Sequence, residues 1–156
     1  RPLSQPGQYL ANERVTVVGP KGKLTNVAVL GPERPEAQVE VSRTDGVSLG
    51  IKPPVRLSGD VDQTPPVIVE GPCGTITLPQ GVIAAQRHIH MTPEDAALQN
   101  VQDGEIVRLK TLTERPVIFE DVAVRVSSKF RTYVHLDYDE ANACGFQPGD
   151  LGRILP

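Results

Sequence analysis

The chain has 156 residues, enough to bury one hydrophobic core or two small ones without stabilising cross-links. Its formal net charge of −3 and the lack of a long basic run argue against a general nucleic-acid-binding protein. The sequence shows no secretory signal, no long apolar span and no Cys-x-x-Cys pair, so we expect a soluble protein of a reducing compartment.

Many short strands are expected, because 15 prolines and 14 glycines are spread between segments rich in valine and threonine. Turn sequences such as Gly19-Pro-Lys-Gly22 separate these segments. The chain is therefore predicted to be mostly β, with strands at 15–18, 24–30, 37–42, 67–70, 75–78, 81–90, 106–110, 117–119, 122–126 and 131–137.

Two short helices interrupt the strands. Thr92 is a good N-cap residue, Pro93 suits the first helical position, and acidic residues follow in the first turn. A second helix is predicted over 139–144 and ends at Gly145. The first helix starts directly after His90, so its N-terminus is fixed beside that side chain.

Two parts of the chain match at an offset of 95 residues, for example from Asn26 to Asp121. Asn26-Val-Ala-Val29 aligns with Asp121-Val-Ala-Val124, and 38–42 aligns with 133–137. Chance similarity between β segments is the alternative. A true repeat predicts two small β-barrel domains with short capping helices, the first lacking its opening strand, which we place at residues 1–66 and 67–156.

All three histidines of the chain lie in strand-like segments. Side chains alternate along a strand, so His88 and His90 would project from one face about 6 to 7 Å apart, within reach of one metal ion. With His135 they make three imidazoles, the ligand set of many catalytic zinc sites. The alternative is that they are ordinary surface or hydrogen-bonded side chains. At the repeat offset Glu40 takes the position of His135, and a carboxylate can also bind a metal ion.

Three further residues have two interpretations each. Arg125 interrupts an apolar strand, where it is either a functional cation or part of a solvated face. Cys73 could be a nucleophile, but no base lies beside it in sequence and a turn cysteine is usually only a small residue. Arg87 would point to the strand face opposite His88, which favours a structural role.

Several segments, spread from one end of the chain to the other, carry a resemblance to one enzyme family. They are Leu3-Ser-Gln-Pro-Gly7, Gly31-Pro-Glu-Arg34, Gln38-Val-Glu40, Arg56-Leu-Ser-Gly-Asp60, Gly71-Pro-Cys-Gly74, Gly81-Val-Ile-Ala-Ala-Gln-Arg-His-Ile-His-Met-Thr-Pro-Glu-Asp95 and His135-Leu-Asp-Tyr-Asp-Glu-Ala-Asn142. On these residues the chain resembles the PduL-type phosphotransacylases of bacterial microcompartments. The His-x-His block followed by Met-Thr-Pro is the most specific of the matches.

The resemblance implies an enzyme that moves a short acyl group, such as propanoyl, between coenzyme A and inorganic phosphate with two zinc ions between two β-barrels. One zinc ion would be held by His88, His90 and His135. The other would be held by Glu40 and an N-terminal His-x-His that this sequence does not contain, so one complete zinc site is expected.

Other site residues follow from the resemblance alone. Coenzyme A would contact Leu30 and Asn142, and phosphate would be held by Arg34, Gln38, Ser58 and Arg125. Arginine suits that role, because its planar fork binds two phosphate oxygens at once.

Two other functions stay open at this point. The three-histidine site could support a zinc-dependent esterase or thioesterase that needs no phosphate. A truncated, non-catalytic paralogue could instead serve as an assembly module, which the missing His-x-His favours. The expected partners are acyl-CoA, phosphate, a second copy of the chain and microcompartment shell or cargo proteins, with no nucleic acid or membrane, in the cytoplasm inside a bacterial microcompartment.

Overall fold

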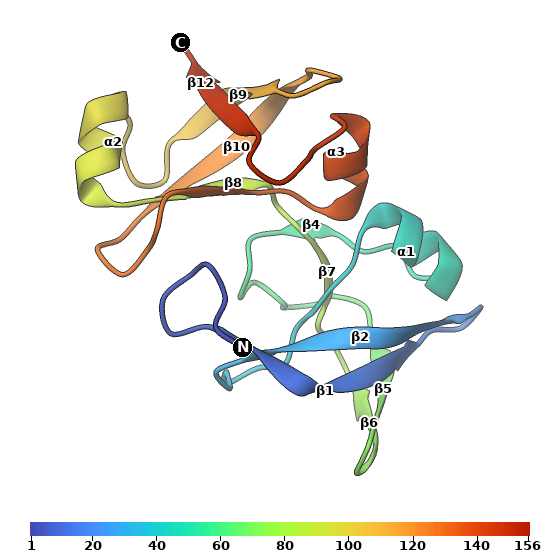
Figure 1. The fold of residues 1–156 in the computed structure, drawn as a ribbon. Helices are drawn as coiled ribbons and strands as arrows, with labels where there is room; N and C mark the ends of the chain where they lie inside the picture. Colours follow the sequence, from blue (N-terminus) through green and yellow to red (C-terminus); the bar gives the residue numbers. More distant parts are fainter. The chain divides into compact units, whose positions relative to one another are not determined.

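The computed structural model describes residues 1–156 and is mostly β, as predicted, with twelve strands and three short helices (Figure 1). The helices are α1 (Arg43–Leu49), α2 (Pro93–Gln99) and α3 (Tyr138–Ala143). The strands are β1 (Tyr9–Val18), β2 (Lys23–Gly31), β3 (Val39–Glu40), β4 (Val55–Arg56), β5 (Val67–Gly71), β6 (Gly74–Leu78), β7 (Val82–Ala85), β8 (His88–Met91), β9 (Ile106–Leu112), β10 (Ile118–Val126), β11 (Tyr133–His135) and β12 (Leu151–Leu155).

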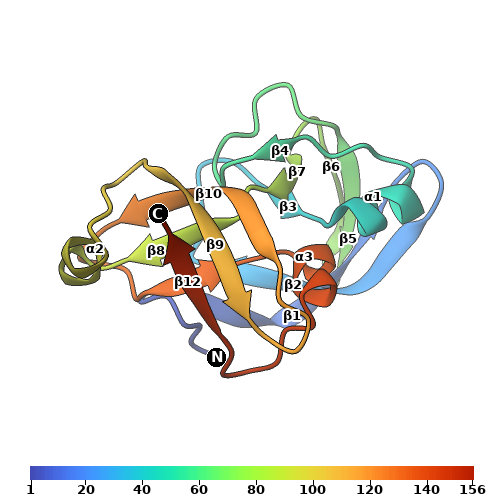
Figure 2. The same cartoon turned by 90° about the horizontal axis from the view of Figure 1, so that it is seen from above.

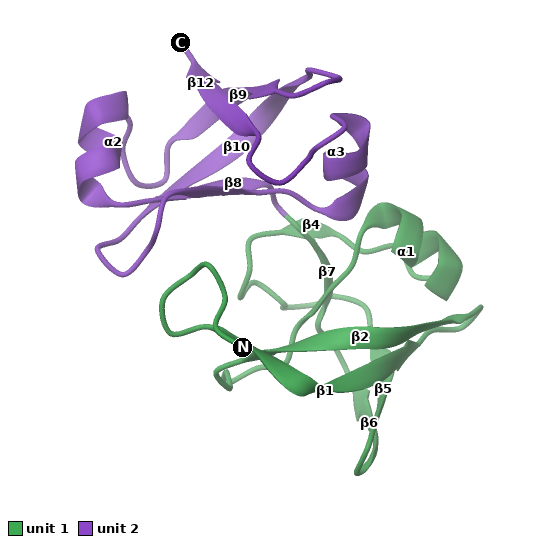
Figure 3. Ribbon diagram, viewed as in Figure 1, with its two compact units in different colours: residues 1–85 green, residues 86–156 purple.

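The chain divides into two compact units, Arg1–Ala85 and Gln86–Pro156, here called unit 1 and unit 2 (Figure 3). The boundary expected from the sequence, between residues 66 and 67, lies inside unit 1. The physical reason is strand pairing: β5 pairs with β1, and β7 pairs with both β3 and β4. These pairings tie 67–85 to the N-terminal half of the chain.

Unit 1 contains two small sheets, with strand orders β2-β1-β5-β6 and β3-β7-β4. Its first sheet is antiparallel throughout, because tight turns join β1 to β2 and β5 to β6. The hydrophobic core of this unit gathers side chains from both sheets and from α1, namely Val17, Val41, Leu49, Val67 and Val82.

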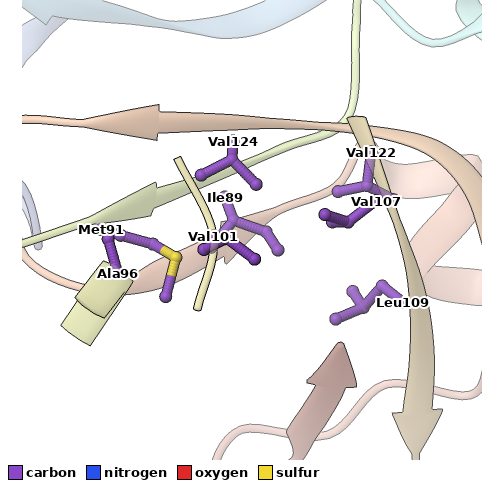
Figure 4. Packing of buried hydrophobic residues seen from close by; sticks show 8 residues of the cluster. All are labelled: Ile89, Met91, Ala96, Val101, Val107, Leu109, Val122 and Val124. Carbon is purple, nitrogen blue, oxygen red and sulfur yellow. The ribbon is translucent and has the colours of Figure 1, made fainter. Parts of the chain in front are cut away.

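Unit 2 is built on one five-stranded sheet of order β11-β8-β10-β9-β12 (Figure 2). β8 runs parallel to β10 and antiparallel to β11, and α2 and α3 lie at opposite ends of β8 (Figure 1). Its core packs against one face of the sheet and is drawn in Figure 4, with Ile89, Met91, Ala96, Val101, Val107, Leu109, Val122 and Val124. Valine, isoleucine and leucine dominate, as expected for a buried sheet face.

The internal repeat predicted from the sequence is present in the elements. At the offset of 95 residues β2 falls on β10, α1 falls on α3, and β3 falls within β11. Asn26 and Asp121 both adopt a positive φ, 58° and 52°. Ser42 and Asp137 both cap their helices in a capping box.

Several details of the element prediction were wrong. The segment from residue 81 to residue 90 is not one strand, because β7 ends at Ala85 and β8 starts at His88 in a different sheet. Helix α1 was missed, although Ser42, Asp45 and the left-handed Gly50 form its caps. The strands predicted at 117–119 and 122–126 are one strand, β10, with a register shift between Phe119 and Val122.

No helix of the chain combines the length and the apolar character that crossing a membrane requires.

Candidate active site

Strand geometry brings the three histidines of the chain together on one face of the unit 2 sheet. In β8 the residues alternate, so Ile89 and Met91 enter the core while His88 and His90 project from the other face. His135 is the register partner of His88 on the neighbouring strand β11, which puts both side chains on the same side. The predicted grouping of the three histidines is therefore confirmed.

The imidazole rings are close enough to share one ligand. One ring nitrogen from each of His88, His90 and His135 lies within 4.8 Å of the other two. The ring centroids are 4.7 Å apart for His88 and His90, 4.7 Å for His88 and His135, and 4.5 Å for His90 and His135. His88 and His90 are buried, with exposed fractions of 8% and 7%, and His135 is half-buried.

A backbone contact selects the tautomer of His88. Its Nδ1 lies 2.8 Å from the carbonyl oxygen of Gln86. A carbonyl can only accept, so Nδ1 carries the proton and Nε2 presents a lone pair. This is the hydrogen bond from the second ring nitrogen that usually orients a metal-binding histidine.

His90 has no such support. Both of its ring nitrogens are buried, and neither has a hydrogen-bond partner. Its ring is oriented instead by stacking on Phe130, with centroids 3.9 Å apart and planes 12° from parallel. A buried nitrogen without a partner costs free energy unless something binds it, so one of these two atoms marks a ligand position.

His90 and His135 are neutral at physiological pH. Burial, helped by His135, His88 and Arg125, lowers the pKa of His90 to about 3. Burial also lowers the pKa of His135 to about 4, with smaller contributions from His88 and Arg125. Neutral imidazole is the form that binds a metal ion, because the ligand nitrogen must keep its lone pair.

Arg125 supplies a positive charge beside the three rings. On β10 it is the register partner of His90 in parallel pairing, so the two side chains leave the sheet on the same face. Its side chain is half-buried and forms no salt bridge. An arginine without a carboxylate partner at a buried site is available to an anionic ligand.

The three histidines fit a divalent metal ion. They offer three nitrogen donors on one face, His90 lacks any other partner, and no carboxylate completes the set, which leaves a position open. This donor set suits zinc, with cobalt or nickel as alternatives.

Unit 1 holds a second polar cluster, which joins four of the residues predicted from the resemblance. Arg34 Nη1 donates to Ser58 Oγ at 3.0 Å, and Gln38 Nε2 donates to the same oxygen at 2.9 Å. Gln38 Nε2 also donates to Glu40 Oε1 at 2.6 Å, and its Oε1 accepts from the Gly59 N–H at 2.6 Å. The Gln38 side-chain amide thus holds both the Glu40 carboxylate and the Ser58 hydroxyl in place.

The remaining candidates lie at the surface. Leu30 is on β2 and is 59% exposed, and Asn142 is exposed on α3. Cys73 is a free, exposed cysteine between β5 and β6, whereas Cys144 is free and buried. Sequence reasoning missed Phe130 and Gln86, because their roles depend on a ring stack and a backbone carbonyl that no local pattern encodes.

Comparison with known proteins shows the family to which the chain belongs. The family model described as phosphate propanoyltransferase matches residues 1–147. A phosphate propanoyltransferase of Enterococcus faecalis is 56% identical over 153 residues, which cover 98% of this chain and 72% of the relative.

Two other relatives with the same name come from Listeria monocytogenes and Thermotoga maritima. The protein of Listeria monocytogenes is 54% identical over 155 residues, 99% of this chain and 73% of the relative. The protein of Thermotoga maritima is 51% identical over 154 residues, 98% of this chain and 73% of the relative. The chain therefore belongs to the phosphate propanoyltransferase family and is a phosphate acyltransferase.

Proposed function

We propose that the enzyme transfers a short acyl group, propanoyl or similar, between coenzyme A and inorganic phosphate at the three-histidine face of unit 2. The observation that carries this proposal is the buried cluster of His88, His90 and His135 beside the unpaired Arg125. The names of the relatives support the acyl and phosphate parts of the reaction.

The reaction sets clear demands on the protein. A phosphate oxygen bonds to the thioester carbonyl carbon, the carbon–sulfur bond breaks, and coenzyme A leaves as the thiol. The dianion must be held, the carbonyl polarised and the leaving thiolate stabilised. When bound, a zinc ion would supply Lewis acidity to an oxygen at its open position.

Arg125 is suited to hold phosphate next to the metal-binding histidines. Its guanidinium has five N–H donors and no competing carboxylate, so it can bind two phosphate oxygens at once. Its register with His90 places this charge on the same sheet face. A phosphate bound there would also pair with the charge of the half-buried Arg125 guanidinium.

The unit 1 cluster is proposed as a second contact to the substrates. Ser58 accepts from both Arg34 and Gln38, which holds the Arg34 guanidinium in place for an anion. Glu40 is proposed as a ligand of a second metal ion, and Leu30 and Asn142 as contacts to coenzyme A. These four roles rest on the family resemblance.

Two further expectations also rest on the family resemblance. We propose that the enzyme self-associates and that it acts inside a bacterial microcompartment, in contact with shell or cargo proteins. Size-exclusion chromatography with light scattering would test the first, and co-purification with isolated microcompartments the second.

The decisive experiment measures thiol release from propanoyl-CoA with and without phosphate, after the metal content of the chain has been determined. We expect release that requires phosphate and that disappears in His88→Ala together with the bound metal. Arg125→Lys should raise the KM for phosphate more than that for acyl-CoA, because lysine cannot bind two oxygens in a fork. Arg108→Ala, an exposed arginine of the same unit, is the matched control.

Two results would contradict the proposal. Thiol release at the same rate without phosphate would identify a zinc-dependent thioesterase. Stoichiometric metal binding without turnover would indicate a non-catalytic member of the family.

A further inference from the structure

An ion pair joins the two chain segments that carry His88 and His135. Arg87 directly precedes His88, and Glu140 lies in α3, which starts soon after His135. The Arg87 Nη1 and Glu140 Oε1 atoms are 3.0 Å apart, and both side chains are mostly buried, at 26% and 17% exposure. A pair this far from solvent is held more firmly than an exposed surface pair.

The backbone alone gives His135 little support on this side. β11 is only three residues long, and its pairing with β8 ends where His135 faces His88. In the same register Leu136 would face Arg87, but no strand pairing continues there. The ion pair therefore lies directly beyond the last paired residues of β8 and β11, and it connects the two segments where the strand pairing stops.

The Glu140 carboxylate has two tasks. Its Oε2 accepts from the Asp137 N–H at 3.0 Å, and Asp137 Oδ1 accepts from the Glu140 N–H at 2.8 Å, which forms the capping box of α3. Its Oε1 accepts from Arg87. One carboxylate thus sets where α3 starts and ties that start to the residue before β8.

Arg87 is fixed in turn to β10. Its Nε donates to the Glu120 carbonyl at 2.6 Å, and its guanidinium lies over the Phe119 ring, 5.5 Å from the centroid. β10 is also the strand that carries Arg125. The guanidinium therefore connects β10 and α3 to the residue that directly precedes β8.

We propose that Arg87 and Glu140 are positioning residues, which form a clamp that holds His135 against His88 and α3 at the end of β8. The clamp sets the affinity of the histidine cluster for metal, and through α3 the placement of Asn142 and the KM for acyl-CoA. This inference rests on the proposed function for the identity of the metal site and of the substrate. Residues that orient metal ligands typically change metal affinity by 10- to 100-fold, which gives the scale of effect.

The test compares zinc affinity in the full chain by competition with a chromophoric chelator. Arg87→Met keeps the apolar stem of the side chain and removes the ion pair. Glu140→Gln also removes the ion pair, but it keeps an oxygen that accepts from the Asp137 N–H. We expect each variant to weaken zinc binding by about tenfold. Arg108→Ala breaks a matched pair in the same unit, Arg108 Nε to Glu120 Oε1 at 3.0 Å, and should stay within about twofold of the wild type.

Four more readouts separate positioning from general destabilisation. The double variant Arg87→Met/Glu140→Gln should bind zinc no more weakly than the worse single variant, because both changes break one interaction. Arg87→Lys should recover part of the loss. Cobalt(II) absorption of the clamp variants should change in shape, which reports altered ligand geometry, and KM for propanoyl-CoA should rise more than kcat falls.

The inference is overturned if folded Arg87→Met and Glu140→Gln both bind zinc within twofold of the wild type, or if their effects simply add. Should Arg87→Met fail to fold, Glu140→Gln decides the question, because it preserves the helix cap. The proposed reaction would be rejected and the clamp kept if the wild type binds zinc tightly without phosphate-dependent turnover, while the clamp variants bind zinc more weakly. Zinc binding that survives His88→Ala would reject both.

Discussion

At the residue scale, the histidine cluster is an arrangement that folding alone does not favour. Two ring nitrogens of His90 are buried without a partner, and the Arg125 charge stands beside the rings with no carboxylate to pair it. Each of these features costs free energy in the absence of a ligand. A metal ion bound to one His90 nitrogen and an anion bound to the guanidinium would remove part of these costs, so the site is organised for its ligands.

The cost should appear as a pH dependence of stability in the metal-free protein. The pKa values of His90 and His135 are lowered from 6.5 to about 3 and about 4, so below pH 6.5 the unfolded chain binds protons that the folded chain does not. The free energy of unfolding should therefore fall as the pH drops from about 6.5 towards 4, by up to about 1.4 kcal/mol per pH unit for each histidine.

Urea denaturation at several pH values, with a chelator present, measures this effect. His90→Asn/His135→Asn is the control, because carboxylates titrate equally in both proteins and only the two histidines differ. The free energy of unfolding of the wild type, relative to that of the variant, should fall towards acid. Parallel curves would show that the two histidines titrate normally in the folded state.

At the element scale, local patterns predicted most of the frame and tertiary contacts decided the rest. Alternation along β8 was enough to place His88 and His90 together, and the cap at Thr92 was enough to start α2. The partner of His88 on β11 depends on a strand register between distant segments, which no local pattern specifies. The break between β7 and β8 could not be predicted from the local sequence either. It arises because the two strands join different sheets.

Helix α1 was missed because a glycine in a seven-residue segment argues against a helix. The structure shows why Gly46 is there. A Cβ atom at this position would lie 2.7 Å from the Ile51 carbonyl oxygen and 2.7 Å from Pro53 Cδ. The chain that leaves α1 folds back so closely that the helix has no room for a side chain at Gly46, and tight packing overrides helix propensity.

Gly46→Ala should therefore destabilise unit 1, although alanine is the better helix former. The steric cost of overpacking, about 1–3 kcal/mol, exceeds the gain of about 1 kcal/mol in helix propensity. Ser48→Ala, at an exposed position of the same helix, should be neutral or slightly stabilising. Chemical denaturation of the two variants measures the difference, and a Gly46→Ala protein as stable as Ser48→Ala would refute the packing explanation.

At the scale of the whole molecule, one repeated framework carries two different sets of side chains. The matching elements include the positive-φ residues Asn26 in β2 and Asp121 in β10, yet Glu40 and Leu30 of unit 1 stand where His135 and Arg125 stand in unit 2. The framework fixes where side chains emerge, and substitutions at those positions decide the chemistry. Only the unit 2 set brings three metal-binding side chains together.

This difference predicts that zinc stabilises unit 2 selectively. Zinc at 100 times its dissociation constant should add about 2.7 kcal/mol to the free energy of unfolding of the part that binds it. In hydrogen exchange monitored by mass spectrometry, we expect added protection in peptides covering β8, β10 and β11. Peptides covering β1 and β2 should exchange at the same rate with and without zinc, because unit 1 supplies none of the three ligands.

In His88→Ala the protection should vanish, which ties it to this cluster and not to adventitious zinc. Protection centred on Glu40 and β3 instead would place the tighter metal site in unit 1, and it would contradict the assignment of the metal to the three histidines.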